Sequence, residues 1–139
     1  MTVALRPHHL LCLLTYSGEG YNSAFVANFD SIAERIGQGE DIHVVCGPDD
    51  ICAVLLDEPD CHCLEERARE RDRLAAVDIE AASGQAVDTG GAFVLDVAAL
   101  GSLRRAFSRG AIRKACRGCE WEGLCTRIAK ASYARAVIR

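Results

Sequence analysis

Three cysteines near the end of the chain, Cys116, Cys119 and Cys125, form a C-x2-C-x5-C run that constrains the fold more than any other feature. The spacing between Cys116 and Cys119 lets one backbone turn point two thiolates at a single metal centre. The five residues before Cys125 let the chain come round and supply a third thiolate. In a reducing cytosol this spacing predicts a metal or iron–sulfur site completed by a distant fourth ligand.

The composition indicates one ordinary globular domain. Of the 139 residues, 50% are apolar and 26% are charged, which is enough for a hydrophobic core without disulfides. We expect residues 1–139 to form a single compact domain whose N- and C-terminal segments are joined by the metal site. The sequence lacks an apolar run that could span a membrane and a secretion signal, which predicts a cytoplasmic protein with no membrane partner.

Apolar periodicity predicts a mainly helical, α+β fold with at most a small sheet. We expect helices over about 8–14, 23–36, 64–82, 97–109 and 125–137, with a short strand over 42–46. The helix over 64–82 has so many acid–base neighbours that we interpret it as a solvated face rather than a binding site. The last helix is expected to begin near Cys125 and to bury Ile128 and Ala131.

Charge is unevenly distributed along the chain. Residues 1–100 carry 6 basic and 18 acidic side chains, whereas residues 101–139 carry 10 and 2, which together give the net charge of −4. The cations of the last third either stabilise an anionic thiolate-bound centre or form a surface for an acidic redox partner protein. Arg104, Arg105 and Arg109 are the residues expected to form that surface. An acidic chain without a recognised nucleic-acid module is expected not to bind nucleic acid.

The N-terminal sequence segment around His8, His9 and Cys12 is the second unusual feature of the chain. His8 and Cys12 lie four residues apart, and this spacing places them on one face of a helix where they could share a metal. The alternative is that Cys12 is a small buried residue and that the histidines bond backbone at the start of a helix. A metal-dependent enzyme using these three residues is a further alternative, although the sequence predicts no specific catalytic residue.

Three more residues are candidates for a supporting role at the site. Asp49 and Asp50 follow a Gly-Pro turn, where they either cap and form the turn or accept hydrogen bonds from His8, His9 or a metal ligand. Trp121, inside the cysteine run, is expected to shield the site from water.

The choice of metal rests on the number and spacing of the sulfur ligands. Structural zinc sites are usually assembled from two short cysteine pairs, but the second close pair here, Cys61 and Cys63, has only one residue between its members. One pair with remote single cysteines favours a cubane iron–sulfur cluster over zinc. The C-terminal run also resembles that of nucleases with an iron staple, in which a remote N-terminal cysteine completes a [4Fe–4S] site. Cys12 stands in the corresponding place.

Several phrases occur in order along the chain. They are Arg6-Pro7-His8-His9-Leu10-Leu11-Cys12, Gly18-Glu19-Gly20-Tyr21, Phe25-Val26-Ala27-Asn28, Gly47-Pro48-Asp49-Asp50-Ile51-Cys52, His62-Cys63, Arg71-Asp72 and the run from Cys116 to Cys125. Together they resemble domain of unknown function 1284, a family of small bacterial and archaeal proteins. The resemblance implies iron–sulfur binding, with motif positions at Cys12, Cys52, Cys63, Cys116, Cys119 and Cys125, and implies no established reaction.

These observations predict an iron–sulfur protein, with [4Fe–4S] as the expected cluster. The first-choice ligands are Cys12, Cys116, Cys119 and Cys125, and either Cys52 or Cys63 is the substitute for the fourth place. Electron transfer or redox sensing is the expected role. The alternatives are a zinc-binding structural or interaction module and the metal-dependent enzyme described above.

Overall fold

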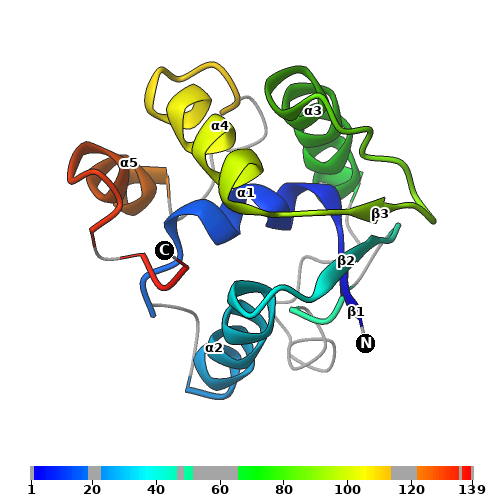
Figure 1. The fold of residues 1–139 in the computed structure, drawn as a ribbon, viewed down its shortest axis with the longest axis horizontal. Helices are drawn as coiled ribbons and strands as arrows, with labels where there is room; N and C mark the ends of the chain where they lie inside the picture. The colour runs from blue at the N-terminus through cyan, green and yellow to red at the C-terminus, as the bar shows by residue number, and fades with distance from the viewer. Residues whose placement is uncertain are drawn as a thin grey trace.

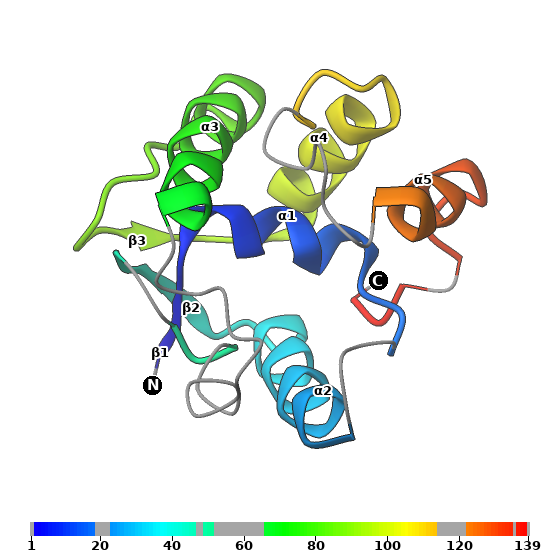
Figure 2. The ribbon, with the colours of Figure 1, turned by 180° about the vertical axis from the view of Figure 1, so that it is seen from behind.

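The chain folds around its first helix, α1 (Pro7–Thr15). A computed structural model describes residues 2–18, 23–46, 49–51, 66–113, 122–134 and 136–138. Helix α1 crosses the middle of the molecule, and α2 (Ser23–Gly37) lies on one side of it (Figures 1 and 2). The four leucines of α1 are all buried, as predicted. A helix that is apolar on several faces must be covered on several sides, which explains its central position.

The remaining helices cover α1 from the other side. They are α3 (Glu66–Ser83), α4 (Val97–Ser108) and α5 (Glu122–Lys130). All three contact α1, and α4 also contacts both α3 and α5. The Asp96 carboxylate accepts a hydrogen bond from the backbone N–H of Ala99 at 2.8 Å, so Asp96 caps α4 as the sequence predicts.

A small mixed sheet lies at one end of α1. Its strands, in the order in which they pair, are β1 (Thr2–Leu5), β2 (Asp41–Val44) and β3 (Ala92–Phe93). Strands β1 and β2 are parallel, whereas β2 and β3 are antiparallel. The predicted strand over 42–46 is therefore confirmed, although it begins one residue earlier and ends two residues earlier than predicted. The mainly helical fold with a small sheet is confirmed as well.

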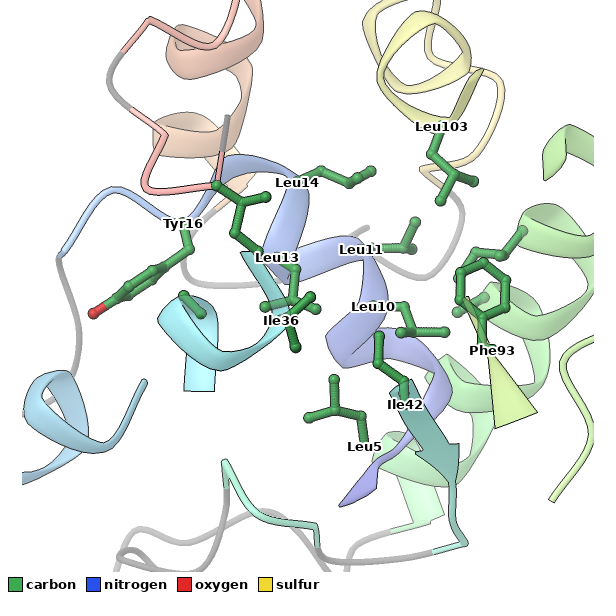
Figure 3. Packing of buried hydrophobic residues seen from close by; sticks show 14 of the residues in the cluster. Leu5, Leu10, Leu11, Leu13, Leu14, Tyr16, Ile36, Ile42, Phe93 and Leu103 are labelled. Atoms are coloured by element: carbon green, nitrogen blue, oxygen red, sulfur yellow. The ribbon is translucent and has the colours of Figure 1, made fainter. Parts of the chain in front are cut away.

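One hydrophobic core joins the sheet to the helices (Figure 3). It contains Leu10 and Leu13 from α1, Ile42 and Phe93 from the sheet, and Leu103 from α4. Each is at most 1% exposed. Burying a side chain of this size contributes roughly 1.5–3 kcal/mol. This core fixes α1, and therefore fixes the residues at both of its ends.

Helix α5 ends earlier than predicted. It stops at Lys130 instead of continuing to 137, and Ala131, which was expected to be buried, is exposed. Ser132 and Tyr133 adopt left-handed backbone conformations, with φ of 55° and 60°. Such conformations cost roughly 1–2 kcal/mol per residue. The Tyr133 hydroxyl offsets part of this cost, because it donates to the backbone oxygen of Arg104 at 2.9 Å.

The last described residues lie beside the end of α1. The backbone N–H of Val137 donates to the carbonyl of Tyr16 at 2.8 Å. Arg104 donates to the carbonyl of Leu14 at 3.0 Å and to that of Ile138 at 2.6 Å. The guanidinium of Arg104 therefore holds the segment around Ile138 against the end of α1. Whether Arg104 also belongs to a partner surface stays a prediction. Arg105 and Arg109 are exposed, as that prediction requires.

Candidate functional site

Cys125 lies next to the end of α1. The Thr15 hydroxyl donates to the Cys125 sulfur at 3.1 Å, although the two residues are 110 positions apart in the chain. Cys12 stands one helical turn before Thr15 and therefore on a similar side of α1. Both cysteines are half-buried against the hydrophobic core. The fold thus brings Cys12 and Cys125 to the same region of the molecule.

Besides the hydrophobic core, polar and basic groups lie close to Cys125. Cys125 is in the first turn of α5, near the backbone N–H groups that favour a negatively charged ligand. Arg113 donates to the Thr126 hydroxyl at 2.7 Å and to the Glu122 carbonyl at 3.1 Å. A fixed guanidinium therefore lies against the turn that carries Cys125, where it would stabilise a thiolate or an anionic cluster.

Several predicted site residues lie outside the part of the chain that the structure describes. They are Cys52, Cys63, Cys116, Cys119 and Trp121. Among the described residues, Cys12, Cys46 and Cys125 carry thiols rather than disulfides. No group of three or more Cys, His, Asp or Glu side chains arranged to hold a metal occurs within those described residues.

A second polar site surrounds His8 at the start of α1. Nδ1 of His8 lies 2.7 Å from a carboxylate oxygen of Asp72, which also accepts the backbone N–H of His8 at 3.2 Å. The other Asp72 oxygen is 2.9 Å from both Nε and an Nη of Arg6. The Arg6 side chain is only 1% exposed. Asp72, on α3, therefore neutralises a buried arginine and holds the His8 ring.

His9 has an equivalent partner on a different segment. Its Nδ1 lies 2.7 Å from a carboxylate oxygen of Asp49, and the Asp49 side chain is fully buried. The same oxygen accepts the backbone N–H of Arg6 at 2.8 Å, while the other accepts that of Ile51 at 3.0 Å. Asp49 is thus the hydrogen-bond partner of His9, and it also accepts the backbone N–H of Arg6, the residue that directly precedes α1.

Asp50, the other acidic candidate, has a different function in the fold. Its carboxylate accepts the backbone N–H of Ala4 at 2.9 Å, and its own N–H donates to the Ala4 carbonyl at 3.0 Å. Asn28 donates to the Asp50 carbonyl at 2.7 Å. These bonds attach the segment 49–51 to β1 and α2, so Asp50 positions Asp49 instead of contacting a histidine in this structure.

The histidine pair is mostly buried, and this changes the protonation of His8. Burial is the largest influence and, with the nearby His9, it lowers the pKa of His8 from 6.5 to about 4, against the opposing effect of Asp72. Burial alone would raise the pKa of Asp72, but the hydrogen bonds from His8 and the charge of Arg6 lower it. His8 is therefore a neutral imidazole at pH 7 beside an ionised carboxylate.

Sequence reasoning missed Asp72. The interpretation of the charged helix as only a solvated face is wrong at this position, because Asp72 contacts Arg6 and His8. The signal was present, since Asp72 falls on the apolar stripe formed by the buried residues Ala68, Ala75 and Ile79. An acid at such a position must have a polar partner on the neighbouring element.

The comparisons with known proteins identify a family but no activity. A family model described as "Protein of unknown function (DUF1284)" matches residues 20–125, which is more than half of the chain. No curated protein and no solved structure matches the chain. None of the helices in the described segments is both long and apolar enough to cross a membrane. The extent of the match, which ends at Cys125, shows that the chain belongs to the DUF1284 family of proteins of unknown function.

Proposed function

We propose that this protein binds an iron–sulfur cluster, expected to be [4Fe–4S], through Cys12, Cys116, Cys119 and Cys125. The observation that carries the proposal is the 3.1 Å contact between Thr15 and Cys125, because Thr15 lies one helical turn after Cys12 on α1. The spacing of the C-terminal run supplies the other two thiolates. Cys52 and Cys63 are the alternatives for the fourth place.

The chemistry around Cys125 suits such a cluster. A hydroxyl donor to a ligand sulfur, a helix N-terminus and a nearby guanidinium all stabilise negative charge, and hydrogen bonds to sulfur help to set a cluster's potential. When bound, the cluster would supply one-electron redox chemistry. Thr15 would orient the Cys125 sulfur and stabilise its charge, while the apolar residues of α1 would limit the access of water.

We further propose that the protein transfers electrons or senses redox state in the cytoplasm, with an acidic redox protein as partner. The exposed cations Arg105, on α4, and Arg109, just after it, support this role, because an acidic surface could dock against them. Reaction chemistry beyond electron transfer is not needed to account for the cysteine arrangement.

The deciding experiment is anaerobic purification followed by analysis of iron and acid-labile sulfide. We expect about four iron and four sulfide per chain for a single cubane. Cys12→Ser should abolish the cluster, whereas the matched control Cys46→Ser, at an exposed position after β2, should retain it. A colourless protein that contains stoichiometric zinc and no sulfide would replace this proposal with a zinc-binding structural module.

A further inference from the structure

Each of the two histidines at the start of α1 uses one ring nitrogen in a hydrogen bond to a carboxylate, and its other ring nitrogen has no hydrogen-bond partner among the described residues. Nδ1 of His8 faces Asp72, and Nδ1 of His9 faces Asp49, both at 2.7 Å. Within the described segments, Nε2 of neither ring forms a hydrogen bond. The side chains are 15% and 14% exposed. Neither Nε2 is among the described buried polar atoms that lack a partner, so each one is accessible to solvent and to a ligand.

The two rings are also close enough to act on one ligand. Their centroids are 4.4 Å apart and the ring planes meet at 62°. Arg6 already neutralises Asp72, so the local charge balance does not require His8 to be a cation. A neutral imidazole that donates from Nδ1 presents a lone pair on Nε2. The two imidazole rings therefore offer two neighbouring nitrogen lone pairs that can bind a metal, rather than two positive charges.

We propose that His8 and His9 bind one divalent transition-metal ion, of the zinc, cobalt or nickel class, through their Nε2 atoms. Imidazole nitrogen suits these ions, and a carboxylate behind the other ring nitrogen is the usual support of a metal-bound histidine. Asp72 and Asp49 are the positioning residues. Water or another donor completes the coordination of the ion. This site is distinct from the proposed cysteine cluster and does not depend on it.

The alternative is that the hydrogen bonds of these histidines are only structural. The bond between His8 and Asp72 would then attach α1 to α3, and the bond between His9 and Asp49 would attach α1 to the segment 49–51. That role uses Nδ1 and leaves Nε2 without a function. Replacement of histidine by asparagine separates the two roles, because the asparagine amide can donate in place of Nδ1 but has no counterpart of Nε2. His43 provides a matched control, since it is exposed on β2 and belongs to neither pair.

The test is titration of the anaerobically purified full chain with Co²⁺, followed by its visible d–d absorption. We expect one bound ion per chain, with a spectrum of nitrogen and oxygen ligands. His8→Asn and His9→Asn should each abolish this binding without changing thermal unfolding of the metal-free chain above pH 6.5, and His43→Asn should bind like wild type. Asp49→Asn should weaken binding about 10–100-fold. Unaltered Co²⁺ binding in both histidine variants, or no binding in wild type, overturns the proposal.

Two further readouts separate this site from the cluster. Iron and sulfide are measured in the same samples, and we expect both to be unchanged in His8→Asn and His9→Asn. A loss of iron in these variants would mean that the histidines serve the cluster, which would overturn a separate site. Sulfur-to-cobalt charge-transfer absorption that disappears in Cys12→Ser would overturn it too, because the ion would then be bound to Cys12.

Discussion

The hydroxyl of Thr15 and the sulfur of Cys125 lie 3.1 Å apart and join the end of α1 to the first turn of α5. This contact is one of several at the same place. The Val137 N–H also donates to the Tyr16 carbonyl, and Arg104 donates to the carbonyls of Leu14 and Ile138. Intramolecular hydrogen bonds therefore hold the C-terminal segment against the end of α1. A metal centre would add to an arrangement already held by the polypeptide.

The first prediction concerns Thr15. Thr15→Val keeps the shape of the side chain and removes the donor to Cys125, so the reduced cluster loses a hydrogen bond that stabilises its extra negative charge. We expect the reduction potential to become more negative while the iron content stays the same. Protein-film voltammetry measures the potential. Thr15→Ser, which keeps the hydroxyl, is the control, and an identical potential in the valine and serine variants would contradict the ligand role of Cys125.

The second prediction concerns removal of the cluster. Because the core and the bonds from Arg104 and Val137 hold the C-terminal segment to the end of α1, we expect a chelator to lower thermal stability without unfolding the protein. Far-ultraviolet circular dichroism before and after removal of iron checks this result. Complete loss of helical signal on chelation would instead make the cluster a structural staple that the fold requires.

The sequence predicts best those helices whose secondary structure is determined by their own residues. Helix α1 follows from its leucines and Pro7, and α4 follows from the Asp96 cap and the spacing of Leu100, Leu103 and Phe107. In both helices, local pattern and tertiary burial agree. These elements could therefore be predicted before the structure was known.

The parts that sequence did not predict depend on distant partners. Strands β1 and β3 are only four and two residues long, and each is a strand because it pairs with β2. Helix α5 ends at Lys130 because Tyr133 turns back to bond Arg104. For the site, His8, His9 and Asp49 were identified from local features. Asp72 was not, although its place on the apolar stripe of α3 indicated a polar partner, because nothing local showed that this partner is His8, 64 residues away.

The third prediction is a pH dependence that originates in His8. The pKa of His8 is lowered from 6.5 to about 4, chiefly by burial and then by His9. The unfolded chain therefore takes up a proton at higher pH than the folded one. Stability is fully present above pH 6.5 and falls as the pH drops towards about 4, by on the order of 3 kcal/mol. The lowered pKa of Asp72 adds its own loss only at still lower pH.

Urea unfolding at a series of pH values, without added divalent metal, measures this dependence. His8→Asn should remove the loss of stability between pH 6.5 and about 4, because asparagine does not titrate there. His43→Asn, on the exposed side of β2, is the control and should unfold like wild type. Equal pH slopes for wild type and His8→Asn would show that His8 is not the source.

The fourth prediction concerns Arg104 and Arg105, adjacent arginines with different surroundings. Burial lowers the pKa of Arg104, whose guanidinium bonds two main-chain carbonyls, whereas Arg105 is exposed. Arg104→Ala leaves these carbonyls without their donor, and we expect a destabilisation of about 2–4 kcal/mol. Arg105→Ala should change the free energy of unfolding by less than about 0.5 kcal/mol. Similar urea midpoints for both variants would contradict a stabilising role of the hydrogen bonds from Arg104 to Leu14 and Ile138.

The fifth prediction tests whether the exposed cations at the end of α4, Arg105 and Arg109, face a partner or serve the cluster. If Arg105 and Arg109 form a docking surface, Arg109→Glu should slow electron exchange with an acidic redox protein, and the effect should shrink as salt is added. Iron content and reduction potential should stay as in wild type. Arg69→Glu, an exposed position on α3, is the matched control, because it changes net charge equally at a different surface. A more negative potential in Arg109→Glu with unchanged exchange kinetics would show that these cations stabilise the cluster instead.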